Sequence, residues 1–435
     1  MNTFLDRLCE AILETDGGDS GSRRLIGRAI ADTVAVSAVG FTETVTRFAV
    51  KTYEGSGGQA WSGARCESRE ASVMINAVAA HSPEFDDVYL EALAHPGTII
   101  VPAILHAGAS HDQDAIISAA AAGLIAARAV GGRLGQAHYG RGWHGTGTVG
   151  VFAATAAAGK LASLGLRQMK GAFGLAAAMS GGLRINFGSM AKPCQAGFAA
   201  AGGVRAVRLA AAGVGAADDV FGPGGYFDLY GNEPTTVSDD LFSLRPDRIS
   251  VKLYPCCYAA SRLIGVALDA YRVLGPVFSD PAVRLRMVVP QGSIAVLRYD
   301  DPIDCLQAKF SAPYAVSAAL VDGFVGLSHF SEAGISRREV RDCMSRLTVE
   351  EDETQPSHGE LTTGVVRLDV FRKGDRLGSY SRSALPGSPG DAPTLDQIRV
   401  KATDCLSTFE RESGHGLPIL DQVRGMSHVA HWLGQ

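Results

Sequence analysis

The sequence predicts a mainly α protein with a smaller α+β part, and three observations support this fold class. From residue 1 to about 265, apolar residues recur at spacings of three and four, the pattern of helices with one buried face. After Pro276 the chain instead contains short β-branched runs that are typical of strands. The 52 glycines and an aromatic content of 7% favour helices packed closely through small side chains. We therefore expect a large all-helical domain over 1–270, completed by 394–435, and a smaller α+β domain over 271–393, inserted like a lid.

Six segments of the first part carry the helical pattern most clearly. Their interiors are rich in Ala and Gly and are interrupted by Gly pairs rather than by β-branched alternation. They are Arg24–Ala38, Ala71–His81, Ile116–Val130, Val149–Leu164, Gly197–Ala212 and Ala259–Leu274. This pattern predicts an all-α first part.

The second part is expected to hold a small sheet with helices packed on it. Strands are predicted at Arg284–Val289, Ile294–Tyr299, Arg346–Val349 and Val365–Phe371, with a hairpin turn at Arg372–Asp375. Helices are predicted at Pro313–Val325 and Ser336–Ser345, and a Pro- and Gly-rich loop, Leu385–Gly390, leads out of the domain. The tail from Thr394 to Leu433 is helical again, so we expect it to return to the first domain.

Charge and hydropathy exclude two classes of partner. The chain has 40 Lys and Arg against 45 Asp and Glu, a net charge of −5, and no block of like charge, so nucleic acid is not expected as a partner. Its longest uncharged apolar stretches, around Ala115–Ala127 and Thr146–Gly159, are shorter than the roughly 18 to 20 residues that a bilayer requires. We therefore expect no membrane span. The first ten residues lack the basic and apolar regions of a signal peptide, so the cytoplasm is the expected location.

The sequence gives no signal for a metal or an organic cofactor. None of the eight cysteines forms a C-x-x-C pair, so they are expected to be reduced thiols. The segment Gly145–Gly150 matches G-x-G-x-x-G, but no buried strand precedes it and no acid follows about twenty residues later. Close helix packing explains these glycines equally well, and we predict neither a dinucleotide site nor a metal site.

Three acids lie close together between apolar helices and form the first candidate site. Glu84, Asp86 and Asp87 would carry a desolvation cost unless something pairs with them. The alternative is a solvated turn with a helix cap. His95 follows in a His-Pro-Gly-Thr sequence.

A histidine between glycines is the second candidate, in Arg141–Gly147. Core packing explains such a residue poorly, and His144 would lie at the N-terminus of a long helix. That position would lower the pKa of the imidazole and supply backbone N–H groups for a substrate carboxylate.

Two lysines in apolar surroundings complete the candidates. Lys192 precedes Pro193 and an Ala- and Gly-rich helix, so its backbone is expected to be extended and its side chain partly buried. Lys252 lies just before Tyr254 and a proline turn. Such lysines suit carboxylate binding or, with a lowered pKa, proton transfer. We assign the proton carrier to Lys192 and the carboxylate anchor to Lys252.

In this order, the segments resemble the MmgE/PrpD family, which includes 2-methylcitrate dehydratases, cis-aconitate decarboxylases and iminodisuccinate epimerases. The resemblance runs nearly end to end. Its motifs are the His-x-x-x-Phe-Asp-Asp segment with His95-Pro-Gly, the Gly-Trp-His loop, Ser-Met-x-Lys192, Lys252-x-Tyr-Pro-Cys and Ala308-Lys-Phe-Ser-x-x-Tyr314. It implies a large helical domain carrying both termini, a smaller α+β lid domain, a homodimer, and catalysis without metal or organic cofactor.

The resemblance also implies a pocket. The chain departs from the family pattern next to this pocket. The implied pocket comprises His95, His144, Lys192, Lys252 and Tyr314, with Asp86 and Asp87 alongside. The dehydratase-type pattern is Asp-Phe-Asp-Asp-Thr, whereas this chain has Glu84-Phe-Asp-Asp-Val88, and the stretch to His95 is one residue longer. The missing hydroxyl removes a hydrogen bond worth about 1 to 3 kcal/mol if its partner is left unpaired.

The function implied is proton transfer at a carbon next to a carboxylate of a small di- or tricarboxylate. Neighbouring cations would stabilise the anion that forms when this proton leaves. We expect first a lyase resembling 2-methylcitrate dehydratase; the alternatives are an epimerase of an iminodisuccinate-type dicarboxylate using two bases, and a relative that only binds. Tyr139, Tyr314 and the two lysines could supply the acid or base, and Tyr139 and Tyr254 are expected to contact the substrate.

Overall fold

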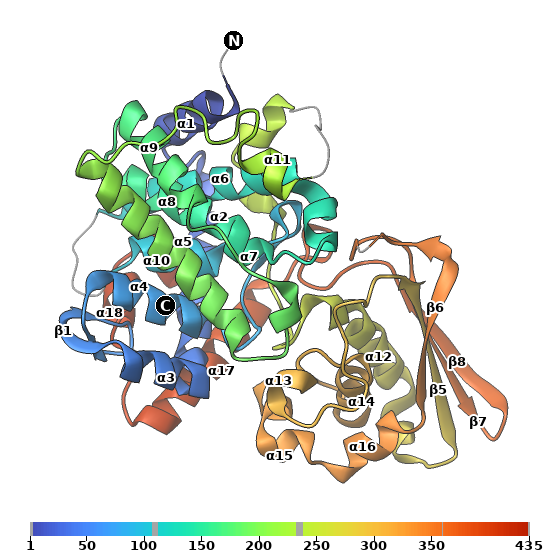
Figure 1. Cartoon of the computed structure of the whole chain (residues 1–435). Coiled ribbons are helices and arrows are strands. Elements are labelled where there is room, and N and C mark those ends of the chain that lie inside the picture. The colour runs from blue at the N-terminus through green and yellow to red at the C-terminus, as the bar shows by residue number, and fades with distance from the viewer. Residues whose placement is uncertain (1–2, 107–111, 232–237, 359, 434–435) are drawn as a thin grey trace. The chain divides into compact units, whose positions relative to one another are not determined.

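The chain forms two compact units (Figure 1). The computed structural model describes residues 3–106, 112–231, 238–358 and 360–433. The first unit comprises Met1–Ile185, Met190–Ser250 and Thr394–Gln435, and the second comprises Asn186–Ser189 and Val251–Pro393.

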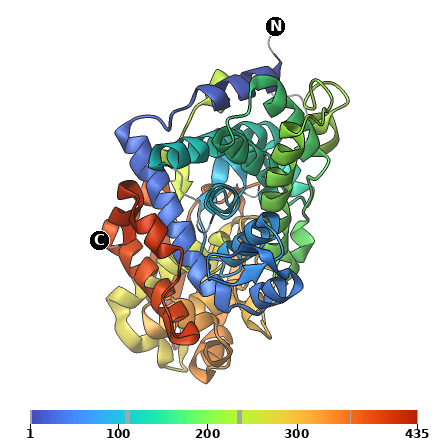
Figure 2. The ribbon, with the colours of Figure 1, turned by 90° about the vertical axis from the view of Figure 1, so that its left-hand side faces the viewer.

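The first unit is built mainly from helices. Its α-helices are α1 (Phe4–Glu14), α2 (Ser20–Thr42), α3 (Thr44–Thr52), α4 (Arg69–His81), α5 (Gly97–Ile104), α6 (Gln113–Gly140), α7 (Gly145–Thr148), α8 (Gly150–Leu161), α9 (Leu166–Ala177), α10 (Ala191–Ala211), α11 (Tyr226–Tyr230), α17 (Leu395–Ser413), α18 (Leu420–Arg424) and α19 (Ser427–Ala430). The C-terminal helices α17 and α19 pack against α2, and Figure 2 shows this returning segment, in red, beside the blue helix α2.

Small residues set the helix spacing in this unit. α8 packs against both α6 and α10, and α10 also packs against α4. A Cβ on Gly203 would come within 2.4 Å of the Ala154 Cβ, so α10 approaches α8 more closely than any side chain at this position would permit. The Ala- and Gly-rich composition therefore reflects tight helix contacts.

Two short β ladders in the first unit correct the prediction of an all-helical part. β1 (Glu54–Gln59) pairs with β2 (Arg65–Cys66), and β3 (Val88–Tyr89) pairs with β4 (Ile249–Ser250), both antiparallel. β1 is half glycine and has no apolar alternation, and β3 and β4 have two residues each. Such segments are too short or too rich in glycine to show the alternation of apolar residues that predicts a strand.

α6 is longer and more apolar than the sequence stretches suggested. By length and composition alone this helix could span a membrane, and a bent pair formed from the α2 and α3 region passes the same test. In the structure 83% of the apolar window of α6 is buried, where it packs against α8, α5 and α1. Its apolar character is that of a central core helix.

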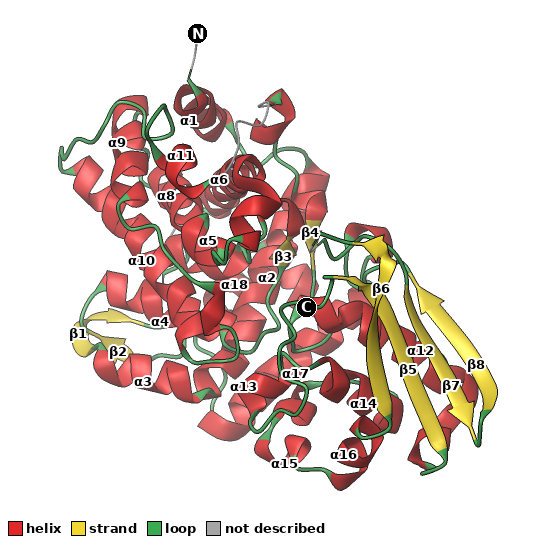
Figure 3. Ribbon diagram, turned by 45° about the vertical axis from the view of Figure 1, so that its right-hand side comes forward, coloured by secondary structure: helices red, strands yellow, loops and turns green. Residues whose placement is uncertain are grey.

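The second unit combines a four-stranded sheet with helices (Figure 3). Its strands are β5 (Val283–Gln291), β6 (Leu347–Pro356), β7 (Val366–Arg372) and β8 (Asp375–Arg382), and its α-helices are α12 (Ser261–Leu274), α13 (Cys305–Ala308), α14 (Ala312–Asp322), α15 (Glu332–Ile335) and α16 (Arg338–Met344). The strand order is β6-β5-β7-β8; β5 is parallel to β6, and the other pairs are antiparallel. The mainly α fold class with a smaller α+β part is therefore confirmed.

Two details of the second unit differ from the sequence expectation. The unit begins at Val251 rather than at 271, because α12 packs against α14 and against β7 and β8. Ile294–Tyr299 forms a turn and irregular chain rather than a strand, with the Leu297 N–H donating to the Ile294 carbonyl. The apolar side chains Ile294, Val296 and Leu297 pack against the core of this unit, and such packing does not require a β ladder.

Candidate active site

The acidic segment before β3 is buried. The exposed fractions of Glu84, Asp86 and Asp87 are 4%, 0% and 1%. The alternative of a solvated turn is therefore wrong. Glu84 has a φ of +58°, in the left-handed region that residues other than glycine rarely occupy, so its surroundings must hold it there.

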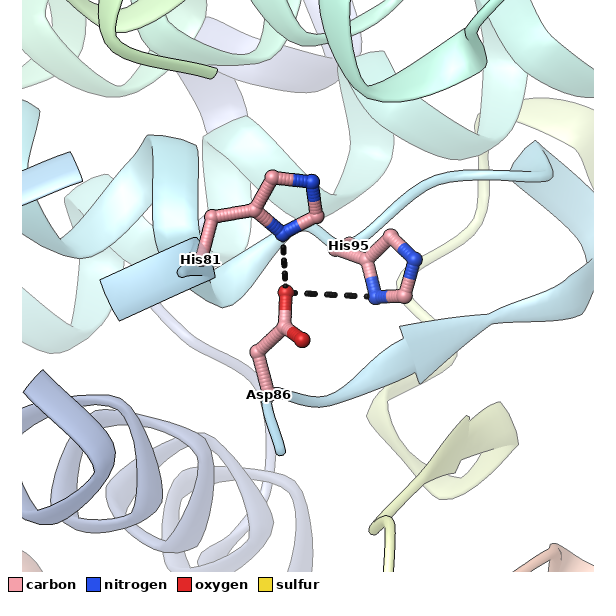
Figure 4. A group of neighbouring side chains, drawn as sticks. All are labelled: His81, Asp86 and His95. Carbon is pink, nitrogen blue, oxygen red and sulfur yellow. Dashed lines mark hydrogen bonds and ion pairs between the residues drawn. The ribbon is translucent and has the colours of Figure 1, made fainter. Parts of the chain in front are cut away.

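Two histidines share one oxygen of Asp86 (Figure 4). His81, the last residue of α4, has its Nδ1 2.6 Å from Asp86 Oδ2. His95 Nδ1 lies 3.3 Å from the same oxygen and 2.7 Å from the Asp87 carbonyl oxygen. Because a carbonyl only accepts, His95 Nδ1 must carry the proton and donate. The His95 side chain remains 17% exposed.

Lys192 reaches this cluster from the first turn of α10. Its backbone is helical rather than extended as predicted, because Pro193 is tolerated inside a first turn where its missing N–H costs no hydrogen bond. The side chain is 3% exposed, forms an ion pair with Glu84, and places Nζ 3.1 Å from His81 Nε2. The Lys192 ammonium thus contacts both Glu84 of the acidic segment and His81.

His144 stands at the N-cap of α7 and belongs to the same cluster. Its Nδ1 donates to the Gln195 side-chain oxygen at 3.2 Å, and its ring stacks on His81 with centroids 5.6 Å apart. Burial, followed by the neighbouring Lys192 ammonium, lowers the pKa of His144 well below its ordinary value. The sequence pointed to the helix terminus as the cause, but desolvation is the largest effect. The site therefore contains a neutral imidazole at pH 7.

Asp87 anchors the segment that carries His95. Its carboxyl group accepts the Gly97 N–H at 2.9 Å, and a Cβ on Gly97 would lie 2.3 Å from the Thr33 hydroxyl oxygen. Burial, followed by the nearby charges of Asp86 and Asp32, raises the pKa of Asp87 to about 8.

A buried ion pair lies behind this segment. Lys401 on α17 donates to Asp32 Oδ1 on α2 and to the Phe85 carbonyl, each at 2.7 Å. Helix α17 thereby contacts the backbone between Glu84 and Asp86.

The structure adds residues that sequence reasoning did not select. His81 is the first residue of the His-x-x-x-Phe-Asp-Asp motif that carried the family resemblance, but it was not selected as a site residue. The others are Asp32, Gln195 and Lys401. The sequence separation of Asp32 and Lys401 leaves no local pattern that could pair them, so only the fold reveals them.

Three predicted site residues belong to the second unit. Lys252 is fully buried there, and burial raises the pKa of Tyr254 to about 12. Tyr314 packs in the hydrophobic core, and its hydroxyl donates to the His329 carbonyl. Core packing accounts for the position of Tyr314, and its catalytic role stays a prediction.

Tyr139 lies in the first unit, on the last turns of α6. The Arg184 guanidinium stacks over its ring, 4.0 Å from the centroid, and donates to its carbonyl at 2.5 Å. These contacts fix its position, and its expected contact with substrate stays a prediction.

The cluster His81, Asp86 and His95 has the residue types of a metal site, with ligand atoms within 4.8 Å of one another. Its hydrogen bonds oppose that use. His95 Nδ1 carries a proton for the Asp87 carbonyl, and the Lys192 ammonium lies against His81 Nε2. Metal binding needs deprotonated ligands, so these residues fit a proton-transfer cluster better.

Activity should therefore survive removal of metal ions. After dialysis against a strong chelator, the turnover rate is expected to stay within about twofold of that of the untreated enzyme. The measurement is the initial rate before and after dialysis, with metal content checked by elemental analysis. Loss of activity that zinc or iron restores would contradict this prediction.

Comparison with known proteins identifies the family of the chain. The MmgE/PrpD N-terminal domain model matches residues 10–237, and the C-terminal domain model matches residues 254–416. The chain belongs to the MmgE/PrpD family. A cis-aconitate decarboxylase of Aspergillus terreus is 29% identical over 345 residues, covering 71% of this chain and 69% of that protein. The human cis-aconitate decarboxylase is 26% identical over 301 residues, covering 64% and 61%. These matches confirm the family and an MmgE/PrpD-type lyase.

Proposed function

We propose that this MmgE/PrpD lyase decarboxylates a small unsaturated tri- or dicarboxylate, delivering a proton to a carbon next to a carboxylate. The observation that carries the proposal is the buried contact of Lys192 with Glu84 and His81, beside His95 and His144. The relatives described as cis-aconitate decarboxylases support decarboxylation over the dehydration expected first from the sequence.

The chemistry needs what this cluster offers. When carbon dioxide leaves, its bonding electron pair stays on carbon and spreads into the neighbouring carboxylate. A nearby cation stabilises that charge, and an acid must then protonate the carbon. We assign the cation and the acid to Lys192. His95, which is partly exposed, is assigned to substrate contact.

Dehydration of a 2-methylcitrate-type substrate is the second candidate. It shares the anion next to a carboxylate but also needs an acid for the departing hydroxyl group. The buried acids at Glu84, Asp86 and Asp87 favour it, because burial raises the pKa of Asp87 to about 8 and keeps an acidic proton available near neutral pH. The longer Glu84 and the apolar Val88 are expected to alter the substrate in either case.

Proton NMR in deuterium oxide separates these reactions. With cis-aconitate, decarboxylation is expected to give new vinyl signals, one deuterium in the product and an equivalent of carbon dioxide. With 2-methylcitrate, dehydration that removes the hydrogen of the methyl-bearing carbon would turn the methyl doublet into a singlet on the new double bond, without carbon dioxide. Deuterium entering a substrate such as iminodisuccinate without net change would identify the epimerase and contradict the lyase proposal. No change in any carboxylate tested would indicate a binding protein and contradict it as well.

Two further expectations complete the proposal. We propose that the enzyme works as a homodimer, as the family resemblance implies, and in the cytoplasm. Light scattering on the purified chain checks the first expectation: a mass near twice 45.4 kDa is expected, and a monomer at assay concentration would contradict it.

A further inference from the structure

His81 occupies a position between an acid and the lysine of the proposed reaction. The histidine is fully buried, with Nδ1 2.6 Å from Asp86 Oδ2 and Nε2 3.1 Å from Lys192 Nζ. Its ring contacts those of His144, at a centroid distance of 5.6 Å, and His95, at 5.0 Å. Each ring nitrogen therefore has a definite neighbour.

These contacts fix how the ring is protonated. Asp86 is a carboxylate acceptor, so Nδ1 carries the proton of the neutral ring and Nε2 accepts from the Lys192 ammonium. Burial, followed by the charge of Lys192, lowers the pKa of His81, whereas Asp86 and Glu84 act in the opposite direction. An acid that orients a histidine, which in turn contacts the reacting group, is the arrangement that activates nucleophiles and bases in many enzymes.

We propose, on the basis of the lyase function above, that His81 is a positioning residue that exchanges a proton with Lys192 during turnover, while Asp86 holds its ring. When the Lys192 ammonium gives a proton to the substrate carbon, it becomes a neutral amine. A proton from solvent is then taken up at Nε2 of neutral His81, where Asp86 stabilises the imidazolium, and passes from Nε2 to Nζ. Lys192 and His81 thereby return to their starting states, so the proton count balances over the cycle.

The first test needs no substrate. Nitrogen-15 NMR of the imidazole groups, assigned by the signal missing in His81→Gln, follows the titration of His81 in the wild type and in Lys192→Met. Removing the ammonium is expected to raise the pKa of His81 by one pH unit or more. An unchanged titration would overturn the contact on which the proposal rests, whether or not the lyase function is correct.

The second test is kinetic. His81→Gln is expected to lower kcat by about 10²-fold, the low end for acid–base catalysis, with KM within about threefold of the wild-type value. The kcat–pH profile should also change, because the variant no longer contains the ionisation of His81. A kcat near that of the wild type, or a loss with an unchanged pH profile, would overturn the proposal.

A matched control separates this role from the loss of any buried histidine. His329 in the second unit is also buried, and its Nε2 lies 2.8 Å from a carboxylate oxygen of Asp322. His329→Gln should leave kcat and its pH profile within about twofold of the wild type, with folding checked by circular dichroism. If the wild-type enzyme turns over no carboxylate, the proposed lyase function is wrong. The NMR titration then still tests the contact between His81 and Lys192.

Discussion

Replacing Lys192 by Met is expected to lower kcat by about 10² to 10⁴-fold, because the variant loses the group that we assign to protonating the substrate carbon. KM should change less than kcat, since the proposed contact acts mainly in the transition state. Steady-state rates with the substrate found by NMR provide the measurement. Full turnover in Lys192→Met would refute the assignment.

The loss of Lys192 also affects stability, so the experiment needs a second variant. Met at this position leaves Glu84 as a buried charge without its ion-pair partner, which costs about 3 to 5 kcal/mol. Lys192→Met combined with Glu84→Gln removes both charges and should recover most of that stability. Activity should remain low in the double variant. If activity returned together with stability, the lysine would be a structural residue.

Tryptophan fluorescence suits these stability measurements. The three tryptophans, Trp61, Trp143 and Trp432, all belong to the first unit. Urea unfolding followed by their emission therefore reports the helical unit that carries the cluster, and circular dichroism reports both units. Agreement of the two curves would show whether a single transition describes the chain.

Much of the fold could be predicted because its signals are local. The helical period in segments such as Ile116–Val130, and β-branched runs such as Val365–Phe371, each predict an element that the structure contains as α6 and β7. Ile294–Tyr299 has the same composition as a strand but packs as irregular chain, because burial of apolar side chains does not require a β partner.

The candidate site could be predicted only in part, for a similar physical reason. Glu84, His95 and Lys192 occur in unusual local settings, so the sequence singles them out. The role of His81 depends on two contacts, one of them with a residue on α10, and a histidine at the end of an apolar helix does not reveal them. Lys401 and Asp32 meet only because the C-terminal helix packs on α2. Long-range contacts of this kind leave no pattern in a single sequence.

The stability of the first unit should fall with rising pH through the ionisation of Asp87. Burial and the neighbouring Asp86 and Asp32 raise the pKa of this carboxyl group to about 8, whereas an unfolded chain ionises near about 3.9. Between these values the folded state binds more protons than the unfolded state. Asp87 therefore lowers the free energy of unfolding by up to about 1.4 kcal/mol for each pH unit across that window.

Asp87→Asn isolates this contribution because Asn keeps an acceptor for the Gly97 N–H but does not titrate. The free energy of unfolding of the variant minus that of the wild type should rise steadily from pH 5 to pH 8, as measured by urea unfolding and tryptophan emission.

Asp6→Asn provides a control, because the pKa of Asp6 is shifted in the opposite direction. Hydrogen bonds from Lys170 and Thr3 lower the pKa of Asp6 to about 2, so its stabilising effect is complete above about pH 4 and is lost only in more acidic solution. Its difference from the wild type should stay constant between pH 5 and pH 8. A flat difference for Asp87→Asn over the same range would mean that Asp87 is ionised in the folded protein. The carboxyl group of Asp87 would then carry a full negative charge during catalysis.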